Sequence, residues 1–242
     1  MNRITTARAC LAALNERSAS VFLLLLLCGD LAFVVMHFIS ALTPVFSSPL
    51  LNIEKDRGYP EMYQYLKFLW IIALLLSLAS ANRAIHYVAW AVVFAYFLLD
   101  DALKVHEWAG RRFAASFTFI PPFGLRLRDL GELAITATVG VLLLPILGWA
   151  YRRGSRMFRK VSQDLTLLIL VLVFFGVVVD VAHEAVDWGW KARFIVGVIE
   201  DGGEMVSVSL ALWFTFLTKV RGDKAVCYLG DLVRTVAAGR RT

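Results

Sequence analysis

Six long apolar segments divide the sequence, and polar or charged stretches separate them. A helix that crosses the hydrocarbon core of a bilayer needs about 20 predominantly apolar residues. All six segments reach that length once the polar ends of the third and fifth are included. The pattern therefore predicts six transmembrane helices, at residues 20–46, 63–82, 85–106, 130–151, 164–186 and 198–219.

The predicted fold is all-α, a polytopic membrane domain that takes up the whole chain, residues 1–242. It consists of an amphipathic cytoplasmic segment (1–19), a six-helix bundle (20–219) and a basic cytoplasmic tail (220–242). The composition agrees, because 59% hydrophobic residues and a mean hydropathy of +0.68 exclude an ordinary soluble domain. The three cysteines lie far apart in the sequence and form no metal-binding or redox motif.

The charges predict the orientation of the chain in the membrane. An even number of helices puts both termini on one side, and the segments of that side hold fifteen Lys and Arg, against eight in the opposite loops. Short cytoplasmic loops carry the excess of basic residues, so both termini are expected in the cytoplasm of a bacterium, with the bundle in its inner membrane. The net charge of +6 is then explained without a nucleic-acid partner.

Two stretches of the sequence resemble each other. Residues 98–139 and 177–212 each contain an apolar helix that ends in acid and His-Glu, then aromatic and basic residues, then Asp-x-x-Glu at the start of another apolar helix. We expect an internal repeat of two helical hairpins, helices three–four and five–six. A pseudo-two-fold axis along the membrane normal would bring both acidic ends together at the outer face.

The repeated acids and histidines are candidate metal ligands. Ionisable groups at membrane depth are unfavourable, so they point to a functional site. Two histidines with several carboxylates and no Cys favour a divalent ion such as Zn, Fe or Mn. The candidate ligands are Asp101, His106, Glu107, Asp129, Glu132, Asp180, His183, Glu184, Asp201 and Glu204.

Helical spacing supports this set unevenly. Asp180, His183 and Glu184 share one helical face, whereas His106 lies about 100° away from Glu107 and can join the site only if its helix loosens near residues 108–110. Two alternatives stay open. One is a hydrogen-bonded polar network between helix ends, with basic loop residues compensating the acids, and the other is a metal-free proton or ion pathway. The basic residues expected in the network are Arg111, Arg112, Lys191 and Arg193.

Asp30 and His37 lie on one face of the first helix, seven residues apart, within an apolar stretch. An Asp–His stripe that leads outward from mid-membrane is what a proton relay needs. The alternative is that each residue binds a partner on a neighbouring helix.

The string from Leu99 to Glu107 and the string from Ile199 to Met205 resemble a pattern in uncharacterised bacterial multi-span proteins. In those proteins an acidic pair and His-Glu close one span, and an acidic segment opens a later one. The resemblance implies a helical bundle with a shared polar site and carries no assigned activity.

The leading functional hypothesis is a metal-dependent enzyme that activates water or oxygen against a lipid-soluble substrate, with Glu184 or Glu204 as the catalytic base. The alternatives are a small cation or proton transporter or channel, and a non-catalytic subunit of a larger membrane complex. In every case the lipid bilayer is the expected surrounding.

Overall fold

A computed structural model describes residues 17–44, 48–81, 84–121, 125–185 and 189–221. These residues form helices and short connections without any β-strand. The predicted cytoplasmic segment 1–19 and the tail 220–242 lie almost entirely outside the described residues. The helices are α2 (Arg17–Leu42), η2 (Pro49–Leu51), α3 (Tyr59–Ala81), α4 (Tyr87–Leu103), α5 (Val105–Ser116), α6 (Leu127–Arg153), α7 (Arg156–Val173), η4 (Phe174–Val179), α8 (Asp180–Ala185) and α9 (Gly189–Arg221).

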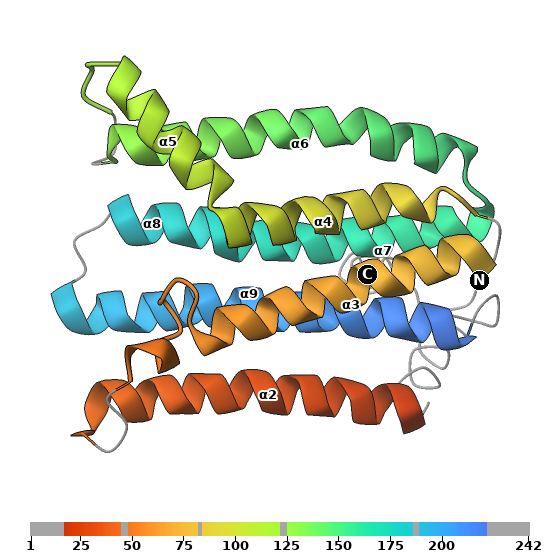
Figure 1. Ribbon diagram of the computed structural model, residues 1–242, viewed down its shortest axis with the longest axis horizontal. Coiled ribbons are helices and arrows are strands. Elements are labelled where there is room, and N and C mark those ends of the chain that lie inside the picture. Colours follow the sequence, from red (N-terminus) through yellow and green to blue (C-terminus); the bar gives the residue numbers. More distant parts are fainter. Residues whose placement is uncertain (1–16, 45–47, 82–83, 122–124, 186–188, 222–242) are drawn as a thin grey trace, which may run out of the picture.

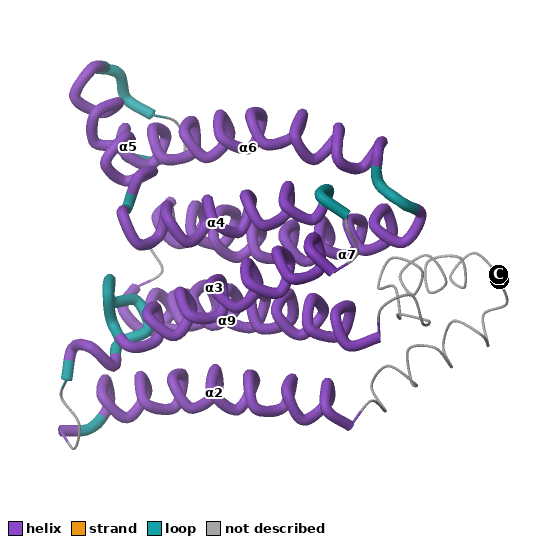
Figure 2. The backbone as a smooth tube through the Cα atoms, turned by 45° about the vertical axis from the view of Figure 1, so that its right-hand side comes forward, coloured by secondary structure: helices purple, strands orange, loops and turns teal. Residues whose placement is uncertain are grey.

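The long helices lie side by side along one direction, and consecutive helices run in opposite senses (Figure 1). In both overall views α2 and α6 lie at opposite edges, with α3, α4, α7 and α9 between them (Figure 2). The loop ends that precede α3, α6 and α9 therefore meet the carboxyl ends of α4 and α8 at one end of the bundle. This is the end that gathers most of the acidic residues.

Four helical segments are long and apolar enough to cross a membrane: α2, α3, α6 and the continuous stretch Arg156–Glu184. Their outward faces are apolar and exposed; for α6, Val141, Leu142 and Leu144 are each 64% exposed. Such faces are compatible with lipid contact. Between the four candidate spans lie α4, which is only 17 residues long, and α9, which carries several charges in its first half.

The centre of the bundle is apolar and closely packed. Phe68 of α3, Phe94 of α4, Leu165 of α7 and Phe214 of α9 are each at most 1% exposed and belong to one apolar cluster. In lipid, such interdigitation holds helices together mainly through van der Waals contact. α4 is shorter than the four candidate spans, and these contacts fix it between the longer helices.

The third apolar segment ends earlier than expected. Its predicted end is residue 106, but α4 ends at Leu103 because Lys104 adopts a left-handed conformation with φ 55°. A non-glycine residue in this region marks a break in the helix. The chain restarts as α5, which leaves at an angle and packs along α6 (Figure 1). The sequence did not predict α5, because nearly all of it falls between the third predicted helix, which ends at residue 106, and the fourth, which begins at residue 130.

A second irregularity lies in the fifth segment. Phe174–Val179 form a π-helical stretch between α7 and α8. Opposite it, a Cβ on Gly203 would collide with the ring of Phe175, and a Cβ on Gly176 would collide with the carboxylate of Glu204. The wider turn and the two glycines let α9 approach closely. π-Helical turns of this kind are common at functional sites.

The structure does not support the expected repeat of two similar hairpins. The first copy is broken at Lys104 and continues in the tilted α5, whereas the second passes through the π-helical stretch directly into α8. The two histidines at matching sequence positions also bind different partners: His106 binds Asp100, six residues earlier, and His183 binds Glu200, seventeen residues later. Similar local sequences have therefore folded differently.

Candidate functional site

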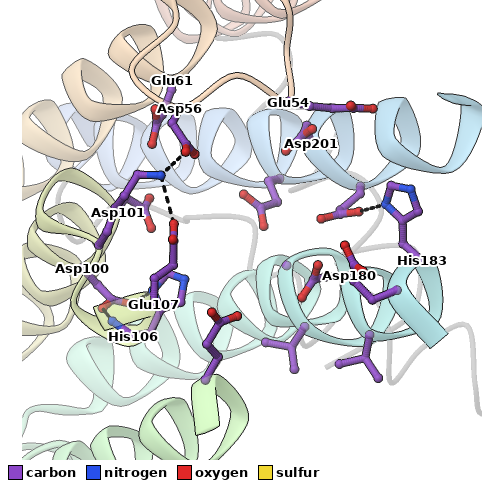
Figure 3. A pocket seen from close by; sticks show the side chains of 18 of the residues that line it. Glu54, Asp56, Glu61, Asp100, Asp101, His106, Glu107, Asp180, His183 and Asp201 are labelled. Atoms are coloured by element: carbon purple, nitrogen blue, oxygen red, sulfur yellow. Dashed lines mark hydrogen bonds and ion pairs between the residues drawn. The ribbon is translucent and has the colours of Figure 1, made fainter. Parts of the chain in front are cut away.

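A cavity of about 780 Å³ opens at the acidic end of the bundle, between α3, α4, α6, η4 and α9. Figure 3 shows Asp100, Asp101 and His106 on one side of it and Asp180 and His183 on the other. Its lining contains thirteen carboxylates, five Lys and Arg, and two His. The carboxylates are those of Glu54, Asp56, Glu61, Asp100, Asp101, Glu107, Asp129, Glu132, Asp180, Glu184, Glu200, Asp201 and Glu204.

Ion pairs neutralise the carboxylates on the α5–α6 side of the cavity. Arg128 binds Glu107 at 2.7 Å and Glu132 at 2.6 Å, and Arg126 binds Asp129 at 2.9 Å and Glu184 at 3.1 Å. Both arginines come from the sequence just before or at the start of α6. We call this group of paired side chains the rim.

Lys104 joins the rim from the break after α4. Its ammonium pairs with Asp56 and, at 3.0 Å, with Glu107. Partial burial by itself raises the pKa of Glu107, but the hydrogen bond and charge of Lys104, with the nearby Arg128, outweigh burial and lower the pKa below its usual value. Glu107 is therefore an ionised, fully partnered carboxylate and a poor metal ligand in this arrangement.

The break at Lys104 also brings His106 back to Asp100. The Asp100 carboxylate accepts hydrogen bonds from the backbone N–H of His106 at 3.0 Å and from its ring Nδ1 at 2.9 Å. His106 lies in α5, outside the four candidate spans. The hydrogen bond to Asp100 is the main reason why the pKa of His106 is raised. The loosening that the sequence required near residues 108–110 occurs instead at Lys104.

His183 has a similar carboxylate support on the opposite side. Its Nδ1 lies 2.8 Å from a carboxylate oxygen of Glu200, which fixes the ring and leaves Nε2 as the free nitrogen. Nε2 is buried and has no hydrogen-bond partner among the described residues. Carboxylate–histidine pairs of this kind orient metal-binding and proton-accepting histidines.

The inner part of the cavity has a different charge balance from the rim. Asp101, Asp201 and Glu204 form no ion pair with any Lys or Arg of the described residues. Glu204 instead feels the negative charges of Asp101, Glu200 and Asp180. We call Asp101, Asp201 and Glu204 the inner carboxylates. Without a proton or a cation among them, their mutual repulsion in a poorly solvated site is unfavourable.

Gln64 of α3 completes the inner part. It is 6% exposed, and its Nε2 lies 3.4 Å from Glu204, a long hydrogen bond. Its Oε1 is buried and has no partner in the described part of the chain. Gln64 was not identified from the sequence. The only signal for it is that a polar residue lies in the second apolar segment, one turn before Lys67.

Asp30 lies outside the cavity, in a buried ion pair. Lys67, which is fully buried, donates to Asp30 at 2.9 Å, to the carbonyl of Met205 at 2.8 Å and to Ser209 at 3.2 Å. Ser209 also donates to the second oxygen of Asp30 at 2.6 Å. The ion pair and its hydrogen bonds connect α2, α3 and α9. Asp30 thus binds a partner on a neighbouring helix, which was the alternative to a proton relay.

His37 is separate from that ion pair. Its Nδ1 accepts a hydrogen bond from the backbone N–H of Ile53 at 3.3 Å, and its ring stacks on Phe194 with centroids 4.9 Å apart. The described contacts therefore join neither residue of the expected Asp30–His37 relay to the other. Each binds a different neighbouring segment.

The candidate metal ligands surround one cavity but do not converge. Within the described ranges, no group of three or more His, Cys, Asp or Glu has the proximity needed to hold a metal ion. Four of the predicted ligands, Glu107, Asp129, Glu132 and Glu184, are held by Arg126 or Arg128. The sequence missed these two arginines as the compensating charges. Of the expected ones, Arg111 and Arg193 form single pairs, with Glu107 and Glu184, and Arg112 and Lys191 lie over tryptophan rings.

Comparison with known proteins identifies a family whose function is unknown. No curated protein and no solved structure matches the chain. A family model described as "Domain of unknown function (DUF8692)" matches residues 19–220, which cover the described helices except for the first two residues of α2 and the last of α9, and include the whole acidic cavity. The chain therefore belongs to the DUF8692 family.

Proposed function

We propose that this protein is an integral membrane protein that binds a cation in the acidic cavity at one end of its bundle. The observation that carries the proposal is the difference between rim and inner carboxylates. Rim carboxylates already have basic partners, whereas Asp101, Asp201 and Glu204 have none among the described residues. A bound cation supplies the missing positive charge. In this proposal α4 and α9 also cross the membrane, which gives six spans and places the cavity at the outer face of a bacterial inner membrane.

A divalent metal is the second candidate, and His183 is the observation that favours it. Its ring is oriented by Glu200 and its Nε2 is free among the described residues. Asp180 and Asp201 are the additional candidate donors on the same side, since each interacts electrostatically with Glu200. The present spacing does not fit a metal as it stands, because no three ligands converge in the described part of the chain. We therefore derive no catalytic step for a lipid-soluble substrate.

Carbodiimide labelling tests cation binding without assuming which cation binds. Dicyclohexylcarbodiimide reacts with protonated carboxyl groups in apolar surroundings, and peptide mass spectrometry locates the product. We expect labelling at Glu204 or Asp201 and protection by at least one of Mn²⁺, Zn²⁺ and octylammonium. Glu107 serves as the internal control, because its ion pairs keep it ionised. Labelling of the inner carboxylates that none of the three cations reduces would overturn the proposal.

A further inference from the structure

The cavity as a whole has the size of a small-molecule site. Ligand pockets for small molecules typically measure about 300–1,000 Å³, and this cavity measures about 780 Å³. A bare metal ion needs ligands at little more than 2 Å, and no such cluster is formed by the described residues. The dimensions therefore favour a cation with a molecular body over an inorganic ion.

The inner end of the cavity offers several hydrogen-bond acceptors. Gln64 turns its nitrogen towards Glu204, so its Oε1 is left as a buried acceptor with no partner among the described residues. The inner carboxylates add further acceptors and negative charge. A buried acceptor without a donor is unfavourable. The matching ligand group carries both positive charge and several N–H donors, which describes a primary ammonium group.

An apolar wall continues from these acceptors into the bundle. The wall consists of side chains from α3, α4, α6, α7 and η4, and the rings of Phe68 and Phe97 stack within it, 6.2 Å apart. Alkyl groups bind such surfaces by removing apolar area from water. The wall is formed by Phe68, Phe97, Leu133, Leu172, Val173 and Val177.

We propose that the inner end of the cavity binds an amphiphilic primary amine. Its ammonium group donates to the Oε1 of Gln64 and to Glu204, and its alkyl chain lies along the apolar wall. The inference rests on the proposed cation binding and names the class of cation. We choose a free alkylamine over an aminophospholipid, because Lys104, Arg126 and Arg128 of the rim are already paired with carboxylates and a lipid phosphate would have to displace them.

Gly176 is part of this site because it makes room for the carboxylate of Glu204. A Cβ at position 176 would collide with Glu204 Oε1. Gly176→Ala therefore moves the carboxylate without changing any charge. This variant separates the position of the negative charge from its presence.

The test is calorimetric titration of the purified full chain in non-ionic detergent with octylammonium chloride. We expect binding of octylammonium, no detectable binding of octanol, and at least about tenfold weaker binding of octyltrimethylammonium, which lacks N–H donors. Glu204→Gln and Gly176→Ala should weaken octylammonium about tenfold or more, and Gln64→Leu about fivefold. Gln163→Leu is the matched control for Gln64→Leu; Gln163 bonds Tyr151 near the opposite end of the bundle.

The outcomes separate this inference from the proposed function. Equal binding of octanol or octyltrimethylammonium would overturn the ammonium site, as would unchanged affinity in Glu204→Gln with native helix content. Tighter binding of phosphatidylethanolamine than of octylammonium would overturn the choice of a free amine. Binding of Mn²⁺ with no binding of amine would overturn the inference and leave cation binding standing. Absence of binding for every cation would overturn both.

Discussion

Asp100 accepts two hydrogen bonds from His106, one from the backbone N–H and one from the ring Nδ1, across the break between α4 and α5. The contact closes the turn that the left-handed Lys104 begins. It therefore fixes the direction in which α5 leaves the bundle and carries Glu107 towards Arg128. The arrangement of the rim depends on this one turn.

The pair should make stability depend on pH. The pKa of His106 is raised above 6.5 in the folded protein, chiefly by the hydrogen bond to Asp100. Its contribution is therefore fully present below about pH 6.5 and is lost as the pH rises through the higher folded-state value. Asp100→Asn should remove this dependence and cost about 1–2 kcal/mol below pH 6. Unfolding curves measured in detergent from pH 5 to 9 check both effects; a variant curve that keeps the wild-type slope would refute the assignment.

Removing one partner of the buried ion pair should be strongly destabilising. In Lys67→Met, Asp30 stays buried without its cation, and we expect a loss of about 3–5 kcal/mol. The double variant Asp30→Asn/Lys67→Met should lose clearly less than the sum of the two single variants, because no uncompensated charge remains. Loss of helical circular dichroism during titration with dodecyl sulfate measures the change in unfolding free energy for each single variant and for the double variant. Additive losses would show that the two side chains do not interact.

The packing of α5 on α6 depends on two glycines. A Cβ on Gly131 would lie 2.8 Å from the Cα of Gly110, closer than such atoms approach in proteins. Gly131→Ala should therefore separate the helices and destabilise the protein by about 1–3 kcal/mol. Gly140→Ala, in the same helix with nothing within 4 Å, is the control, and it should be neutral or stabilising by up to about 1 kcal/mol. Gly131→Ala should lower the unfolding midpoint, whereas Gly140→Ala should leave it unchanged or raise it; equal shifts of the two midpoints would contradict the close approach.

Much of the helical organisation followed from the apolar segments alone. Among the described residues, most of each predicted segment is helical, and the alternation of helix direction explains why the acids of distant segments share one end. The ends were less predictable. α9 begins at Gly189, nine residues before the predicted span, because its first residues mix charged and apolar side chains, and a search for apolar segments does not detect such a helix.

The partners of the charged residues could not be predicted from helical spacing. Asp30 and Lys67 lie in different apolar segments, and their pairing depends on how two helices are rotated about their axes. Arg126 and Arg128 lie at the start of α6, in a stretch that was outside the predicted helices, yet they neutralise four of the predicted ligands. The break at Lys104 depends on a left-handed backbone conformation, and the segment contains no Gly or Pro that would predict it. The predicted ligands therefore fall into two groups, the rim and the inner carboxylates, and only the contacts of the folded chain distinguish them.

Native mass spectrometry of the intact protein tests the central claim most directly, because it counts bound cations of any class. After incubation with octylammonium or with Mn²⁺, the wild-type chain should retain one added cation of at least one class. The variant Asp201→Asn/Glu204→Gln, with the same size and less negative charge, should retain none. Absence of a bound cation in the wild type, or equal retention by the variant, would contradict cation binding by the inner carboxylates.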